Sequence, residues 1–249
     1  MMAVQQLEET PMRPPPLSSA LIAETFGTFL FFFVGAGAVV LTAATPDNNG
    51  GLVGIALAHG LALAVMVSAL GAVSGGHFNP AVTFGVWITG RIEAARAGMY
   101  VAAQLVGGLL AGFALRFVFP ESSWEPVALG TPAVDPGITV GAAIAIEAIL
   151  TMVLLVAVFG TAIDPRAPKI GGLAIGLAVA ADIFMGGPLT GAAMNPARWF
   201  GPAVASGTYD NWYVWWIGPL VGAAIAALIY RFVLEDRGEE GITPATPEP

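Results

Sequence analysis

The chain has 249 residues, of which 56% are hydrophobic and only 10% are charged; because soluble domains carry about 25% charged residues, a chain of this composition belongs in a lipid bilayer. Cysteine is absent, which excludes disulfides, thiolate metal sites and cysteine nucleophiles, and two histidines are too few for a histidine-rich metal centre. The formal net charge of −8 mostly reflects carboxylates near the two chain ends, and such an acidic balance argues against nucleic-acid binding.

The two ends of the chain differ from the apolar region between them. Residues 1–17 contain four prolines and one arginine, without the basic start, short apolar core and cleavage site of a signal peptide. We expect residues 1–17 to be a disordered cytoplasmic leader and residues 237–249 to be a disordered cytoplasmic tail. Residues 18–236 are then expected to form one membrane domain.

Six apolar stretches approach or exceed the length of about 20 residues that a helix needs to cross the hydrocarbon core. The fifth is short unless residues 186–189 complete its last turn. Glycines within the stretches favour close helix packing; they are Gly71, Gly107, Gly108, Gly176 and Gly222. The predicted spans are Ser19–Ala43, Leu52–Gly71, Gly98–Val118, Ile138–Gly160, Ile170–Met185 and Trp212–Leu234.

Two further apolar segments, Asn79–Ile88 and Asn195–Ala205, are too short to span a membrane. As helices they would each rise about 15 Å, which is half of the hydrocarbon thickness. Both begin with Asn and Pro: Asn is a favoured N-cap, and Pro at the first helical position loses no hydrogen bond. We therefore expect two half-helices that enter from opposite sides and meet end to end near the midplane.

The distribution of basic residues orients the chain, because cytoplasmic loops carry an excess of Lys and Arg. With the N-terminus inside, seven of the nine basic residues fall on the cytoplasmic side, whereas Arg116 lies near the outer face and Arg198 lies in the second half-helix. We expect a multi-pass protein of the cell membrane with both termini in the cytoplasm. The seven residues are Arg13, Arg91, Arg96, Arg166, Lys169, Arg231 and Arg237.

The sequence contains an internal repeat. The segment 100–107, YVAAQLVG, aligns with 215–222, WWIGPLVG, and the two Asn-Pro-Ala triplets lie at nearly the same offset. Repeat one covers about residues 18–118 and repeat two about residues 138–234, each with three spans and one half-helix. Because three is odd, the second copy must enter the membrane from the opposite face, which gives an inverted repeat.

Two similar motifs lie at matching places in these repeats, Ser74-Gly-Gly-His-Phe-Asn-Pro-Ala-Val-Thr83 and Thr190-Gly-Ala-Ala-Met-Asn-Pro-Ala-Arg198. With the surrounding spans they closely resemble the aquaporin (major intrinsic protein) family over nearly the whole apolar region. The resemblance implies an all-α membrane protein of six transmembrane helices and two re-entrant half-helices. It also implies that residues 18–236 are an aquaporin-like channel domain that conducts water and excludes protons and ions.

The resemblance gives the two triplets a role at the centre of a pore. Both Asn side chains would donate hydrogen bonds to a passing water, and the two helix N-termini would add positive potential, each roughly half a charge. Together they would repel cations and interrupt a proton-conducting chain of waters. The triplets are Asn79-Pro80-Ala81 and Asn195-Pro196-Ala197.

Counting from the motifs, the resemblance implies a selectivity filter of four residues, His59, Ile183, Ala192 and Arg198. His59 and Arg198 would supply hydrogen-bond donors, Ile183 an apolar wall, and Ala192 free space. This filter resembles that of plant tonoplast intrinsic proteins and implies passage of ammonia, urea or glycerol besides water. A glycerol-preferring facilitator is disfavoured, because Trp199 follows Arg198 where such proteins usually carry Asp.

Four other polar residues need a role in this apolar chain. Acids inside spans are costly and are functional candidates by default. The resemblance implies that Glu24 and Glu147 support the re-entrant loops and that His77 lines the cytoplasmic mouth, where its protonation is a conceivable gate. Asp182 either faces an outer vestibule or bonds to a neighbouring loop, and the sequence gives no account that decides between them.

Other classes of protein remain as alternatives. A secondary transporter also uses inverted repeats and broken helices, although ion coupling would need titratable groups near the midplane, where neutral Asn is expected. A purely adhesive membrane protein is a third possibility, and no catalytic residue set, cofactor or metal site indicates an enzyme. We expect water, small neutral solutes and the lipid bilayer as partners, and the resemblance implies a homotetramer.

Overall fold

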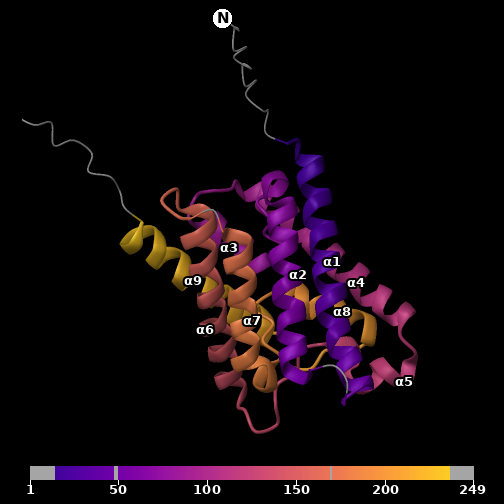
Figure 1. Ribbon diagram of the computed structural model, residues 1–249. Helices are drawn as coiled ribbons and strands as arrows, with labels where there is room; N and C mark the ends of the chain where they lie inside the picture. Colours follow the sequence, from indigo (N-terminus) through magenta and orange to yellow (C-terminus); the bar gives the residue numbers. More distant parts are fainter. Residues whose placement is uncertain (1–14, 48–49, 169, 236–249) are drawn as a thin grey trace, which may run out of the picture.

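The computed structural model describes residues 15–47, 50–168 and 170–235, and within these ranges all regular secondary structure is helical. Six helices are long and apolar enough to cross a membrane, as the sequence predicts, and they form one bundle (Figure 1). Most of the expected leader and all of the expected tail lie outside the described residues. The long helices are α1 Leu17–Ala44, α2 Gly51–Ser74, α4 Ala94–Val118, α6 Val140–Val158, α7 Gly171–Thr190 and α9 Val214–Ile229.

The two predicted half-helices are present as α3, Pro80–Ile88, and α8, Pro196–Ser206. Their 9 and 11 residues rise about 14 and 17 Å, which is roughly half of the hydrocarbon core. Each follows its Asn directly, so the Asn-Pro starts are where the helices begin.

The helices differ from the prediction by one to five residues at most of their ends, and some differences bear on the fold. Helix α7 continues through Pro188 to Thr190, so the fifth span does complete its last turn. Both α6 and α9 end in a π-helical turn, Phe159–Ile163 and Tyr230–Leu234. Between α4 and α6, two short helices were not predicted because no apolar run marks them; they are α5, Glu121–Trp124, and the 3-10 helix η1, Glu125–Gly130.

The contacts between helices follow the internal repeat. Helix α1 packs on α4 as α6 packs on α9, and α2 packs on α7 at the junction between the repeats. Each half-helix packs on the last helix of the other repeat, α3 on α9 and α8 on α4. This exchange brings the N-termini of α3 and α8 together in the middle of the bundle (Figure 1).

Glycines allow these helices to approach closely. An added Cβ at Gly201 in α8 would lie 2.0 Å from the carbonyl oxygen of Gly108 in α4, and one at Gly222 in α9 would lie 2.0 Å from that of Ala148 in α6. No side-chain movement relieves these contacts, because the opposing atoms belong to the backbone. The expectation for Gly71 was wrong, since nothing lies within 4 Å of its Cβ position.

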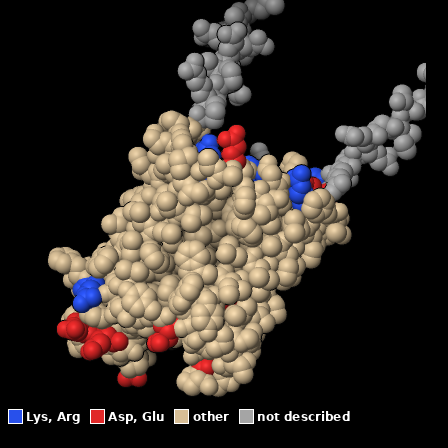
Figure 2. Space-filling model, turned by 180° about the vertical axis from the view of Figure 1, so that it is seen from behind, with Lys and Arg blue, Asp and Glu red and all other residues tan. Residues whose placement is uncertain are grey.

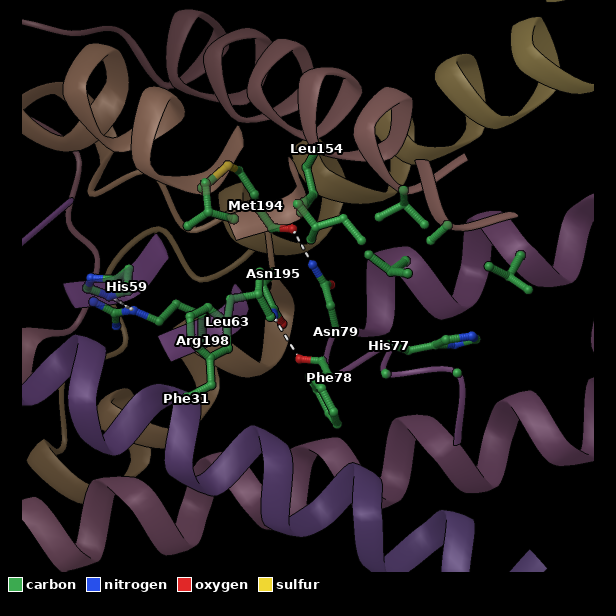
Figure 3. Close-up of a pocket in the computed structure, with 18 of the residues that line it drawn as sticks. Phe31, His59, Leu63, His77, Phe78, Asn79, Leu154, Met194, Asn195 and Arg198 are labelled. Carbon is green, nitrogen blue, oxygen red and sulfur yellow. Dashed lines mark hydrogen bonds between the residues drawn. The ribbon is translucent and has the colours of Figure 1, made fainter. Parts of the chain in front are cut away.

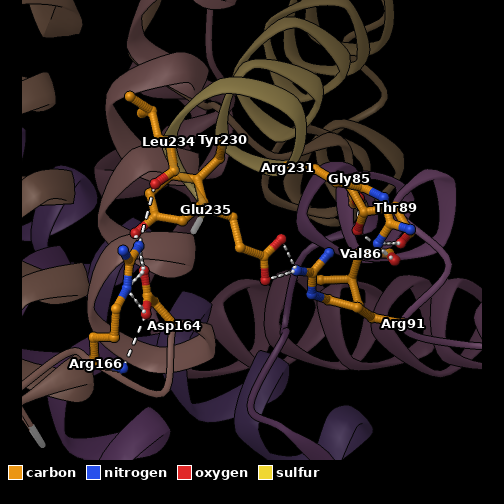
Figure 4. Close-up of polar contacts among 10 residues, drawn as sticks. All are labelled: Gly85, Val86, Thr89, Arg91, Asp164, Arg166, Tyr230, Arg231, Leu234 and Glu235. Carbon is orange, nitrogen blue, oxygen red and sulfur yellow. Dashed lines mark hydrogen bonds and ion pairs between the residues drawn. The ribbon is translucent and has the colours of Figure 1, made fainter. Parts of the chain in front are cut away.

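The two described chain ends lie at the same end of the bundle, which we call the terminal face (Figure 1). Lys and Arg gather there, and Asp and Glu predominate at the opposite end (Figure 2). Polar contacts hold three of the arginines (Figure 4): Arg91 pairs with Glu235 at 2.5 Å, Arg166 pairs with Asp164 at 2.6 Å, and Arg231 donates to the carbonyl of a residue at the end of α3.

Asp164 links the end of α6 to the end of α9 at the terminal face. The hydrogen bonds from Arg166 hold the pKa of its carboxyl well below the ordinary value, and Tyr230 donates to it at 2.9 Å. Because the pKa of Asp164 is lowered in the folded state, its ionised carboxylate stabilises the fold fully above the unfolded-state pKa of about 3.9. This stabilisation is lost as the pH falls from there through the lowered pKa.

The close backbone approach at Gly201 gives a testable prediction. Gly201→Ala forces α8 away from α4 and should lower the free energy of unfolding by about 1–3 kcal/mol, the usual cost of overpacking. The matched control is Gly98→Ala, at an exposed position of α4 with nothing within 4 Å, which should be neutral or stabilising because Ala is the better helix former. Thermal unfolding in detergent measures both, and equal melting of Gly201→Ala and wild type would contradict the packing account.

Candidate functional site

Each half-helix begins with the same local structure. The Oδ1 of Asn79 accepts a hydrogen bond from the Ala81 N–H at 2.8 Å, and the Oδ1 of Asn195 accepts one from the Ala197 N–H at 3.0 Å. In both helices Pro occupies the first position, where no N–H is needed. The side-chain oxygens therefore cap the two helices and fix the orientation of the side-chain amides.

The two asparagines also bind each other's loops. The Nδ2 of Asn79 donates to the carbonyl of Met194 at 2.9 Å, and the Nδ2 of Asn195 donates to the carbonyl of Phe78 at 3.0 Å (Figure 3). Each carbonyl belongs to the residue that precedes the other asparagine, so the two loops are joined reciprocally. Because an amide nitrogen carries two N–H groups, one from each asparagine is left for a molecule in the cavity that both residues line.

The backbone before each asparagine is held in an unusual conformation. Phe78 has a φ of 46° and Met194 has a φ of 51°, which lie in the left-handed region that residues other than glycine rarely adopt. Such residues persist only where their surroundings fix them. Here two buried carboxylates, from α1 and α6, bind the loop N–H groups.

Glu24 on α1 binds the first loop and is fully buried. Its carboxylate accepts hydrogen bonds from the backbone N–H groups of His77 at 3.0 Å and Phe78 at 2.7 Å. It also accepts from the hydroxyl of Ser74 at 2.6 Å and from the side-chain amide of Gln104 at 2.8 Å. All of these donors lie where lipid could not satisfy them.

Glu147 on α6 does the same for the second loop and is also fully buried. It accepts from the backbone N–H groups of Ala193 at 3.0 Å and Met194 at 2.7 Å, and from the hydroxyl of Thr190 at 2.7 Å. The matching contacts in the two repeats place each carboxylate between a long helix and the loop that carries the asparagine of its own repeat.

Two cavities lie along the middle of the bundle, and among the described residues His59, Ile183 and Arg198 line both of them. The first cavity passes the two asparagines and reaches Arg91 near the terminal face. The second is bordered by η1 and the loop after it, at the opposite end. The three shared residues therefore lie between the two cavities, and we call them the partition.

Arg198 and His59 contact each other at this partition. The Nε of Arg198 donates to the Nε2 of His59 at 3.1 Å, and its Nη1 donates to the carbonyl of Gly130 in η1 at 2.8 Å. The other imidazole nitrogen, Nδ1, lies 2.9 Å from the carbonyl of Ile55. These partners assign a neutral imidazole with the proton on Nδ1, because Nε2 must accept from Arg198.

Ala192 lies beside the partition but lines only the first cavity. Its backbone φ of 44° is again in the left-handed region, and its N–H contacts the hydroxyl of Thr190 at 3.3 Å. The four predicted filter residues thus come from α2, α7, the loop after α7 and α8, and all four side chains are buried.

His77 lies on the other side of the asparagines from His59 (Figure 3). It lines the first cavity, as Arg91 does. Its Nδ1 is 3.1 Å from the hydroxyl of Thr83, and its ring packs edge-on against Tyr100 with 5.3 Å between the centroids.

Asp182 lies within α7 and is almost fully buried. It is 3% exposed and lines neither of the two cavities, so it does not face a vestibule. Its Oδ2 is buried without a hydrogen-bond partner among the described residues, so this oxygen does not bind a neighbouring loop. Within the same residues no group of His, Asp and Glu is arranged to hold a metal ion.

Sequence reasoning missed the groups of this site that belong to the backbone. The carbonyls of Gly130, Phe78 and Met194 accept hydrogen bonds from Arg198 and the two asparagines, and no residue type marks such acceptors. It also missed Phe31, which lines the first cavity beside His59. The sequence did carry a signal for Phe31, because a residue seven positions after Glu24 lies on the same face of a helix.

Comparison with known proteins identifies the chain. The model of the family described as "Major intrinsic protein" matches residues 12–230. The chain belongs to the major intrinsic protein family. Aquaporin TIP4-4 of Zea mays is 46% identical over 217 residues, which cover 85% of this chain and 84% of that relative. Probable aquaporin TIP3-2 of Arabidopsis thaliana is 45% identical, over 88% of this chain and 85% of that relative.

The fold is also similar to that of a solved aquaglyceroporin. The X-ray structure of the aquaglyceroporin from Plasmodium falciparum superimposes with a TM-score of 0.76 at 25% sequence identity, covering 88% of this chain and 97% of that one. As a member of the major intrinsic protein family, this chain is an integral membrane protein and a passive channel for water and small solutes. The family consists of channels and not enzymes, and a secondary transporter is not favoured.

The support of the second loop can be tested at Glu147. Glu147→Ala leaves two backbone N–H groups and a hydroxyl without an acceptor in a buried site, at about 1–3 kcal/mol for each group. We expect little folded protein, whereas Glu147→Gln keeps one acceptor oxygen and should lose less. Glu121→Ala, at an exposed acid outside the long helices, is the control. Folded yield by size-exclusion chromatography decides, and a normal yield of Glu147→Ala would contradict this role.

Proposed function

We propose that the two cavities form one continuous pore and that His59, Ile183, Ala192 and Arg198 are its selectivity filter. The observation that carries this proposal is the partition, because three of the four residues are the ones that line both cavities. A solute that moves from one chamber to the other must pass between these side chains. The filter therefore decides which neutral molecules accompany water.

The chemistry of the partition favours small polar solutes. Arg198 is fixed by His59 and Gly130, and its remaining N–H groups are donors for a solute oxygen or nitrogen. Ile183 supplies an apolar wall, and the methyl group of Ala192 occupies little space. Ammonia and urea fit this arrangement, and glycerol fits less well because the filter has no aromatic wall apart from the imidazole. The cationic guanidinium repels cations.

The asparagine pair supplies the second barrier in this proposal. Two helix N-termini directed at the first cavity place positive potential there, and each asparagine has one N–H left for a water molecule. A water that accepts two such hydrogen bonds is oriented and does not pass a proton along a continuous chain. Asn79 and Asn195 thus exclude protons and cations, while the filter selects among neutral solutes.

The orientation and assembly follow from charge and family. We place the terminal face in the cytoplasm, because Arg91, Arg166 and Arg231 all lie there and basic residues favour that side. His77 then lies at the cytoplasmic mouth. We propose the cell membrane as the location of the protein; the plant relatives, which are named as TIP aquaporins, do not support this location. We propose residues 18–236 as the channel domain, and a homotetramer with one pore in each protomer.

The filter is tested by narrowing it. His59→Phe places a larger ring at the partition and removes the acceptor for Arg198, so we expect urea and glycerol uptake relative to water to fall by about tenfold, the lower range of what a methylene changes in a pocket. Leu61→Phe, on the exposed side of α2, is the matched control and should change neither the solute uptake nor the water permeability. Stopped-flow light scattering of proteoliposomes measures both, and an unchanged solute-to-water ratio in His59→Phe would refute the assignment.

A further inference from the structure

Gly35 on α1 lies directly against the imidazole of His59. An added Cβ at Gly35 would lie 2.4 Å from Cδ2, 2.6 Å from Nε2 and 2.8 Å from Cγ of that ring. These distances are far inside van der Waals contact, so the ring occupies the volume that any side chain at residue 35 would need. Both residues are buried, and α1 packs along α2.

This contact differs from the helix-packing contacts of other glycines. Added Cβ atoms at Gly108, Gly201 and Gly222 would meet backbone carbonyls of the opposing helix first. At Gly35 the three nearest atoms all belong to the side chain of one filter residue. An added side chain at Gly35 therefore meets the ring of His59 before any backbone atom, and Gly35 leaves a recess on α1 that the imidazole fills.

Three contacts fix the ring in this recess. Its Nδ1 hydrogen-bonds the Ile55 carbonyl within α2, its Nε2 accepts from Arg198, and the ring of Phe31 packs edge-on against it with 6.2 Å between the centroids. Phe31 lies one helical turn before Gly35 on α1. The open space beside the ring is that of the cavities it already borders, so a ring displaced from α1 moves toward them.

We propose that Gly35 is a specificity-determining residue of the channel, which acts by holding His59 back from the pore and in contact with Arg198. The inference rests on the proposed filter role of His59. A side chain at residue 35 pushes the Nε2 edge of the imidazole into the partition and separates it from the Arg198 Nε. The pore narrows at the filter, although no pore-lining residue has been replaced.

A second glycine on the same face of α1 shows the same arrangement. An added Cβ at Gly27, eight residues before Gly35, would lie 2.2 Å from the ring of Phe78, the residue that precedes Asn79. Gly27, Phe31 and Gly35 are spaced by four residues and so share one face of the helix. Helix α1 thus shapes the pore wall through the space that it leaves, at the filter and beside the asparagines.

The experiment compares Gly35→Ala with Gly37→Ala in proteoliposomes. Gly37 lies on the same helix, and an added Cβ there would lie 3.1 Å from the flexible end of Leu115 and 4.0 Å from the ring of Phe119. We expect Gly35→Ala to lower the urea-to-water permeability ratio by about tenfold, as expected for one methylene of filled space, and Gly37→Ala to leave the ratio unchanged. An unchanged ratio in Gly35→Ala would overturn the proposal.

The double variant Gly35→Ala/His59→Ala separates the recess from general packing. With the imidazole removed, the added methyl group has space, so the double variant should show the same ratio as His59→Ala alone. An equal fall of the ratio in both backgrounds would overturn the proposal. If His59→Ala by itself leaves the ratio at the wild-type value, the filter assignment fails; if it changes the ratio and Gly35→Ala does not, only the role of Gly35 fails.

Folding gives a second measurement. If Gly35→Ala does not yield folded protein, the double variant decides, because removal of the imidazole should restore both the folded yield and water conduction. Restored yield supports the recess, since a backbone clash would persist without His59. A double variant that remains unfolded would show that the methyl group meets something other than the imidazole and would overturn the proposal.

Discussion

The structure depends on one constraint: backbone polar groups in the middle of a membrane have no water to bind. A chain that stops halfway across and turns back exposes N–H groups that helices normally satisfy internally. Two buried carboxylates, Glu24 and Glu147, accept those hydrogen bonds. The reciprocal bonds of Asn79 and Asn195 then join the two loops. The strained residues before each asparagine persist because a glutamate binds the N–H of each and the opposite asparagine binds its carbonyl.

The same constraint explains why the proposed pore has polar groups at a few positions and an apolar wall elsewhere. Among the described residues, the asparagine amides and Arg198 supply donors that do not hold the loops, and Arg198 is itself fixed by a carbonyl of η1 and by His59. The remaining wall is largely hydrocarbon, so a passing molecule finds few hydrogen-bond partners. An ion would lose its hydration without replacement and would meet positive potential, whereas a neutral molecule loses much less.

The sequence predicted the fold well because its signals are physical. Apolar length gives the six spans, and the Asn-Pro starts give both half-helices within a residue of where they begin. The internal repeat gives the inverted arrangement. The sequence did not predict α5 and η1, because neither has an apolar run. The close helix packing expected at Gly71 was also wrong, because the sequence does not show which face of its helix a glycine occupies. The cross bonds to Phe78 and Met194 involve carbonyls, which no residue type marks.

The most direct test of the central claim measures water and proton flux in the same proteoliposomes. Stopped-flow light scattering reports the water permeability, and a pH-sensitive dye inside the vesicles reports proton entry under an imposed pH gradient. The account predicts water flow well above that of empty vesicles, with proton entry equal to that of empty vesicles. Water flow equal to that of empty vesicles, or proton entry that rises together with water flow, would contradict it.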